Sequence, residues 1–108
     1  MFQSQHDLTH TYTKSTRLRY LQYLPFGYSD DPDKKWPLIL FLHGIGERGD
    51  NLEKVKLQGL PRIVDDFSDF PFILISPQCP EDTRWECELD ALDYLLNKVV
   101  GELNVDED

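Results

Sequence analysis

The chain has 108 residues, enough for one domain, and its 11 basic and 20 acidic side chains give a net charge of −9. This acidic balance argues against a nucleic-acid partner, because binding to a phosphate backbone requires a basic face. No apolar run approaches the ~18–20 residues of a membrane span. The N-terminus lacks the basic and apolar regions of a signal peptide. We therefore expect a cytoplasmic protein with no membrane span.

The excess acid lies entirely in the second half of the chain. Residues 1–54 hold 7 basic and 7 acidic side chains, whereas residues 55–108 hold 4 and 13. A solvated helix face and an acidic end account for this distribution. No spacing of the acids matches a calcium loop, so we expect no metal and no cofactor. Two cysteines are too few for a disulfide scaffold and should be reduced in this compartment.

The N-terminal quarter predicts two strands. Residues 9–13 are β-branched and aromatic, and residues 17–24 alternate well enough for a half-buried strand. A polar loop over residues 29–35 follows. The run Leu38–Leu42 is apolar without alternation, which is typical of a parallel strand buried on both faces.

Two short helices are expected next, after the glycine-rich segment His43–Asp50. Asp50 or Asn51 is a suitable cap for a helix that ends by Gly59, and Pro61 suits the first turn of a second helix. The first helix would include Leu52, Val55 and Lys56, and the second would carry Ile63, Val64 and Phe67.

Another buried parallel strand is predicted over Phe72–Ile75, followed by a loop over Ser76–Glu86 whose two prolines disfavour helix. Apolar residues then recur at spacings of three and four, which predicts an amphipathic helix of about four turns. Its apolar positions are Leu89, Leu92, Leu96, Val99 and Leu103.

This order of elements predicts an α/β fold, a three-layer sandwich with a parallel sheet between helices. Ligands of such sheets bind at the C-terminal ends of the strands. The loops His43–Asp50 and Ser76–Glu86 both follow buried strands, so both should lie at that edge.

The segment His43-Gly44-Ile45-Gly46 carries the strongest chemical signal. Glycines after a strand let backbone N–H groups approach a ligand, and such an N–H can stabilise the oxyanion of acyl transfer. A tight turn without a ligand is the structural alternative. Residues 44–49 also satisfy the letters of the dinucleotide motif G-x-G-x-x-G, but Glu47 would face the pyrophosphate and no acid ends the next strand.

Three stretches together resemble a known family: Tyr23–Pro25, Trp36–Asn51 and Phe70–Pro80. They are similar to the phospholipase/carboxylesterase-like serine esterases of the α/β-hydrolase superfamily, also described as prolyl-oligopeptidase-family or depolymerase-like hydrolases. The resemblance runs from about Leu18 onward. It implies that residues 1–108 are a single partial domain, the N-terminal part of the α/β-hydrolase fold, truncated before the nucleophile elbow.

The resemblance also implies roles for individual residues. The backbone N–H of Ile45 would serve the oxyanion hole, shaped by Gly44 and Gly46, and His43 would support the loop rather than act as the base. Trp85 would line an acyl or alcohol pocket, with a packed loop aromatic as the alternative. Bracing of the loop by ion pairs and hydrogen bonds is expected from Glu47, Arg48 and Asp50.

The residues of the triad are not identifiable in the chain. None of the five serines stands in G-x-S-x-G, and the acid and histidine follow the nucleophile in this fold. No base is identifiable beside Cys79 or Cys87, so neither is expected to be a nucleophile.

Three functional hypotheses follow. The first is a fragment of a serine hydrolase that cleaves a small-molecule ester through an acyl-enzyme and is inactive alone. The second is a non-catalytic binding or assembly module that pairs with a separate chain. The third is an unrelated small α/β domain. Under the first, the strand Leu38–Leu42 would be an uncovered sheet edge, which predicts self-association or recruitment of a partner.

Overall fold

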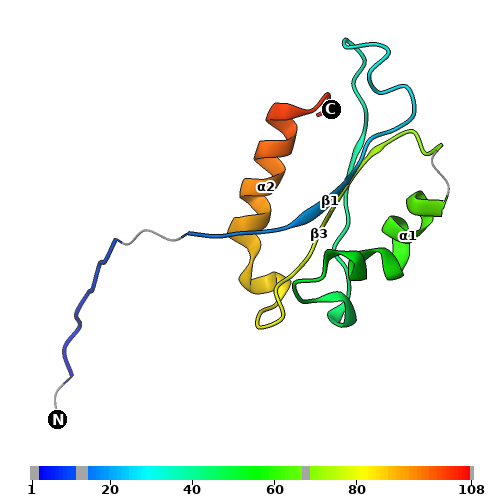
Figure 1. Cartoon of the computed structure of the whole chain (residues 1–108). Helices are drawn as coiled ribbons and strands as arrows, with labels where there is room; N and C mark the ends of the chain where they lie inside the picture. The colour runs from blue at the N-terminus through cyan, green and yellow to red at the C-terminus, as the bar shows by residue number, and fades with distance from the viewer. Residues whose placement is uncertain (1–2, 12–14, 67–68, 108) are drawn as a thin grey trace.

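A computed structural model describes residues 3–11, 15–66 and 69–107. Its centre is a three-stranded sheet in the order β1-β3-β2, formed by Tyr20–Tyr23 (β1), Leu38–Leu40 (β2) and Ile73–Pro77 (β3). Strand β1 runs antiparallel to β3, and β2 runs parallel to it with Ile39 opposite Leu74. The chain is a small mixed α/β structure (Figure 1).

Strand β3 separates the two halves of the interior, because side chains of a strand alternate between its faces. All five of its residues are buried. Ile73 and Ile75 belong to the main hydrophobic cluster with Leu95 and Val99 of helix α2 (Leu89–Glu102). Figure 1 shows α2 and helix α1 (Gly59–Asp66) on opposite sides of the strands.

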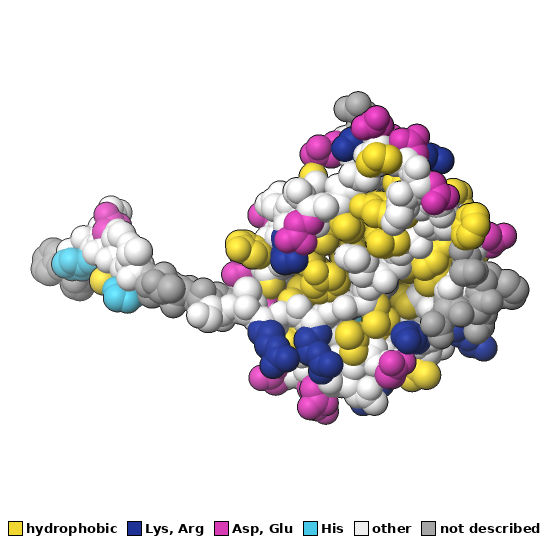
Figure 2. Space-filling view, turned by 45° about the horizontal axis from the view of Figure 1, so that its top comes forward, with side chains coloured by type: hydrophobic (Ala, Val, Ile, Leu, Met, Phe, Trp, Pro, Cys, Tyr) yellow, Lys and Arg dark blue, Asp and Glu magenta, His cyan; other side chains and the backbone are white. Residues whose placement is uncertain are grey.

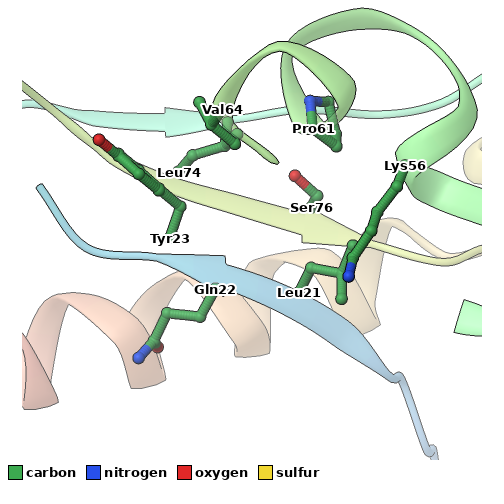
Figure 3. A pocket seen from close by; sticks show the side chains of 8 residues that line it. All are labelled: Leu21, Gln22, Tyr23, Lys56, Pro61, Val64, Leu74 and Ser76. Carbon is green, nitrogen blue, oxygen red and sulfur yellow. The ribbon is translucent and has the colours of Figure 1, made fainter. Parts of the chain in front are cut away.

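A pocket lies on the other face of the sheet. Leu74 and Ser76 face a pocket of about 200 Å³ between β1, β3 and α1 (Figure 3). Figure 3 shows the Ser76 hydroxyl pointing toward Pro61 of α1. Lys56 lies at the rim and pairs with Glu53 at 3.1 Å.

The N-terminal and edge strands differ from prediction. Residues 9–11 form no strand, and 12–13 lie outside the described residues. Of residues 17–24, only Tyr20–Tyr23 are strand. The expected burial of 38–42 on both faces is wrong, because β2 stops at Leu40, is half-buried, and leaves Leu42 40% exposed. The physical reason is position: β2 is an edge strand of the described sheet.

The two helices after the glycine loop are present with altered geometry. Asn51 caps the first as predicted, accepting a hydrogen bond from the Glu53 N–H at 3.2 Å, but the helix is a 3₁₀-helix, η2 (Leu52–Leu57). The second, α1, begins at Gly59, so Pro61 lies in its first turn as predicted. Gly59 has φ +70°, so it makes the turn between the two helices as well as starting the second. Phe67 lies outside the described residues.

Helix α2 is confirmed, but its buried stripe is rotated from the predicted one. Leu92 and Val99 are buried as expected, whereas Leu89 is 64% and Leu96 is 37% exposed. Ala91 and Leu95 are buried instead. The helix packs against one sheet face, so only the narrower stripe that meets Ile73 and Ile75 is covered. No described helix is long and apolar enough to cross a membrane.

After α2 the chain returns to the sheet. Val105 forms a parallel bridge with Trp36, just before β2. The Trp36 N–H donates to the Asn104 carbonyl at 2.8 Å, and the Asp106 N–H donates to the Trp36 carbonyl at 2.7 Å. This contact lies on the side of β2 opposite β3 and has the geometry of the start of a fourth strand.

Candidate functional site

A second, larger cleft lies where the chain leaves β2 and β3. It has a volume of about 370 Å³ and joins the loop after β2 to the loop after β3, which confirms that both predicted loops share this edge. Its lining consists of His43, Gly44, Ile45, Arg48, Cys79, Arg84, Trp85 and Glu86.

His43 ties the two loops together. Its ring is buried, and Nε2 accepts a hydrogen bond from the Cys79 backbone N–H at 2.8 Å. Because Nε2 is an acceptor, the proton is on Nδ1, which donates to the Gly44 carbonyl. Both ring nitrogens are therefore occupied, and the imidazole has no free lone pair for a substrate. This geometry fits the supporting role expected for His43.

Trp85 lines the cleft beside His43. It begins the 3₁₀-helix η3 (Trp85–Cys87), and its indole Nε1–H donates to the His43 carbonyl at 3.1 Å. The two rings are tilted, with centroids 5.1 Å apart. The side chain is therefore both a packed loop aromatic and a lining residue of the cleft.

The glycine loop is braced mainly through backbone carbonyls. The Gln78 side-chain amide donates to the carbonyls of Glu47 (2.9 Å) and Asn51 (2.7 Å). Arg48 donates from Nη1 to the Thr83 carbonyl at 2.9 Å and from Nε to the Ile45 carbonyl at 3.3 Å. The expected ion pairs are replaced by these bonds, since no described residue forms a salt bridge with Arg48.

Asp50 and Glu47 brace the loop through their backbone carbonyls rather than through their carboxylates. Arg19 donates from Nη1 to the backbone carbonyl of Asp50 at 2.6 Å. Glu47 is buried at 8% exposure, and its backbone carbonyl receives the Gln78 amide. Gln78 was not singled out from the sequence, and only its place directly after a buried strand hinted at it.

Ile45 begins the 3₁₀-helix η1 (Ile45–Glu47), and its side chain is 78% exposed. The first N–H groups of a helix have no partner within that helix. Gly44 before it is extended, with φ −82° and ψ −173°. Gly46 is not among the lining residues of the cleft.

The glycines of the loop differ in backbone conformation. Neither Gly44 nor Gly46 has positive φ, and a Cβ at either would meet nothing closer than 3.7 Å. The left-handed position in the loop is Gly49, at φ +134°, whose N–H donates to the Cys79 carbonyl at 3.0 Å. The left-handed turn of the loop is therefore made at Gly49.

Neither cysteine has the surroundings of a nucleophile. Burial raises the pKa of the Cys79 thiol above its ordinary value, and the carboxylate of Glu88 raises it further. The thiol faces the Thr83 carbonyl at 3.6 Å. Cys87 is exposed, and both thiols are free. Within the described ranges, no three His, Cys, Asp or Glu side chains gather in a metal-binding cluster.

Two charged lining residues, Arg84 and Glu86, were missed at the sequence level. They flank Trp85 in a loop that reads only as polar. No motif or periodicity separates them from other surface charges.

The chain was compared with family models, curated proteins and solved structures. Neither a family model nor a curated protein matches the chain. A solved structure described as a thermostable esterase superposes with a TM-score of 0.64 and 28% sequence identity, over 84% of this chain. The match spans only 28% of the esterase chain. The segment therefore has the fold of an esterase fragment.

Proposed function

We propose that this chain is the N-terminal part of a serine hydrolase domain, and that it supplies one donor of the oxyanion hole. The complete fold would be an α/β-hydrolase sandwich, and the reaction would be hydrolysis of a carboxylic ester in the cytoplasm. The supporting observation is the position of Ile45, at the start of η1 in a cleft formed by the loops after β2 and β3.

The chemistry divides between this chain and residues outside it. A serine oxygen would attack the ester carbonyl carbon, and the carbonyl oxygen would gain the negative charge. The Ile45 N–H would donate a hydrogen bond to that oxygen, in a loop held by His43, Trp85 and Gln78. Gly44 and Gly46 would leave room for the ester beside this N–H. Trp85 would bound the pocket for its acyl or alcohol group.

The nucleophile, acid and base would lie beyond residue 108. The chain spans 28% of the length of the esterase that it superposes on, and none of its serines stands in G-x-S-x-G. On this proposal the 108 residues alone hydrolyse no ester. The polypeptide that the gene encodes past the codon for Asp108 would contain the elbow.

The test removes the donor without moving the loop. Proline has no N–H but fits the first position of a helix, and the extended Gly44 before it suits a residue preceding proline. In the polypeptide that also carries the nucleophile, Ile45→Pro should lower kcat roughly 10²–10³-fold. Ile45→Ala keeps the N–H and should act like the wild type.

A non-catalytic assembly module is the second candidate. The observation that favours it is the outer side of β2, which has no neighbouring strand among the described residues apart from the bridge between Trp36 and Val105. A separate chain with an apolar strand would complete the sheet there. Co-purification of one defined partner, in place of a downstream elbow in the gene, would support this candidate.

A further inference from the structure

The electrostatic character of the cleft identifies a class of substrate. Its lining carries two guanidinium groups, of Arg48 and Arg84, and one carboxylate, of Glu86. The whole chain has a net charge of −9, so this small basic excess is opposite in sign to the rest of the molecule. Clefts that concentrate one sign of charge favour ligands of the other sign.

Among the described residues, neither arginine forms an ion pair with a carboxylate. The ion pairs Lys56–Glu53 and Lys98–Glu102 both lie outside the cleft. Arg48 is fixed by the neutral carbonyls of Thr83 and Ile45, which use two of its five N–H donors. Its charge is therefore held within hydrogen-bond distance of the residue that begins η1.

The wall beside Arg84 is aromatic. Trp85 lines the cleft and is held by its bond to the His43 carbonyl. A ligand that fits this lining has an apolar or aromatic body against the indole and an anionic group toward the guanidiniums. Glu86 disfavours a second anionic group on the same side.

We propose that the cleft accepts esters whose acyl or alcohol part carries a carboxylate, with Arg84 as a specificity-determining residue and Arg48 as a fixed cation. The inference rests on the proposed function for the ester. The recognition of the carboxylate is a binding property, so it can be measured with ligands that contain no ester.

The experiment compares phenylacetate with its neutral isostere phenylacetamide. Both are titrated into the ¹⁵N-labelled protein while the indole Nε1–H signal of Trp85 is followed, with that of the core residue Trp36 as internal reference. We expect phenylacetate to bind more tightly than the amide. Arg84→Gln should weaken phenylacetate about fivefold, the upper range for an exposed ion pair. Glu86→Gln should tighten it.

The matched control is Arg62→Gln, an equal loss of charge on α1 and outside the lining of the cleft. It should leave the binding of phenylacetate unchanged. Equal affinity for acid and amide, or equal effects of Arg84→Gln and Arg62→Gln, would overturn the proposal. If Ile45→Pro keeps the turnover of the wild type while phenylacetate still binds more tightly than phenylacetamide, only the oxyanion role of Ile45 is contradicted.

Discussion

At the scale of single residues, the site depends on buried polar groups that satisfy one another. His43 accepts from the Cys79 N–H and donates to the Gly44 carbonyl, and Trp85 caps the His43 carbonyl. Each bond joins the loop after β2 to its own backbone or to the loop after β3. The two loops are therefore held against each other before any ligand binds, as the proposed oxyanion role requires.

His43→Ala should destabilise the fold measurably. The substitution leaves the Cys79 N–H buried without its acceptor, which costs about 1–3 kcal/mol. Urea denaturation followed by circular dichroism measures this loss. His6→Ala, in the exposed N-terminal segment, is the control and should have no effect. An equal midpoint for the two variants would contradict the role of His43.

The two thiols should differ in reactivity toward a thiol reagent. Cys87 is exposed and should react in the folded protein, whereas Cys79 is buried with a raised pKa and should react only after unfolding. Stopped-flow labelling of Cys79→Ala and Cys87→Ala separates the two rates. Fast labelling of Cys79 in the folded Cys87→Ala variant would contradict this account of the cleft wall.

The same pKa shift predicts the sign of a pH effect. The folded state keeps the Cys79 proton to higher pH than the unfolded state does. The stability that this thiol contributes is therefore complete below the unfolded pKa and is lost as the pH rises through the folded pKa. Chemical denaturation above pH 8 should show a steeper loss of stability in the wild type than in Cys79→Ala.

At the scale of elements, the predictions from the sequence were most accurate where burial is complete. The uninterrupted apolar run of β3 and the three-four spacing of α2 both predicted the right type of element. Strand β2 has the same apolar pattern but half the burial, since its place in the sheet is set by contacts distant in sequence. The stripe of α2 was misplaced for the same reason.

Gly59 illustrates a constraint that only the structure exposes. A Cβ at this position would lie 2.5 Å from Cζ of Phe41, and φ is +70°. We expect Gly59→Ala to destabilise the protein by about 1–2 kcal/mol. Gly101→Ala is the matched control, because Gly101 is helical with nothing within 4 Å. It should be neutral or stabilise by up to about 1 kcal/mol. The same effect for both variants would refute this geometry.

At the scale of the whole molecule, the sheet has an incomplete edge. The Pro37 carbonyl and the Phe41 N–H bond to β3, whereas the N–H and carbonyl of Trp36 bond to residues 104 and 106. By alternation, the backbone groups of Leu38 and Leu40 face the same outer side as Trp36. Figure 2 also shows hydrophobic side chains gathered in the middle of one face, with acidic side chains around them.

This edge predicts self-association of the 108-residue chain. Leu42 follows β2 and is 40% exposed, so Leu42→Lys should place a charge beside the open strand and favour the monomer. Leu57→Lys adds the same charge at a residue of η2 that is 60% exposed, and should leave association as in the wild type. Sedimentation velocity distinguishes them. A monomeric wild type would contradict the prediction.

The candidate site was predictable in part. The glycine loop, His43 and Trp85 were singled out from motif and resemblance, and they do lie around one cleft. Gly49, which makes the left-handed turn of the loop, was not among the predicted site residues. Arg84 and Glu86 belong to no local sequence pattern. A charged residue in a polar loop can be identified as part of a site only when the fold is known to place it in a cleft.

The most direct measurement is the turnover of an ester by the polypeptide that joins this segment to its nucleophile, compared between Ile45→Pro and Ile45→Ala. If the Ile45 N–H holds the oxyanion, the proline variant should lose roughly 10²–10³-fold in kcat while the alanine variant stays within a few-fold of the wild type. Both should keep the stability of the wild type. Equal turnover by the two variants would contradict the central claim.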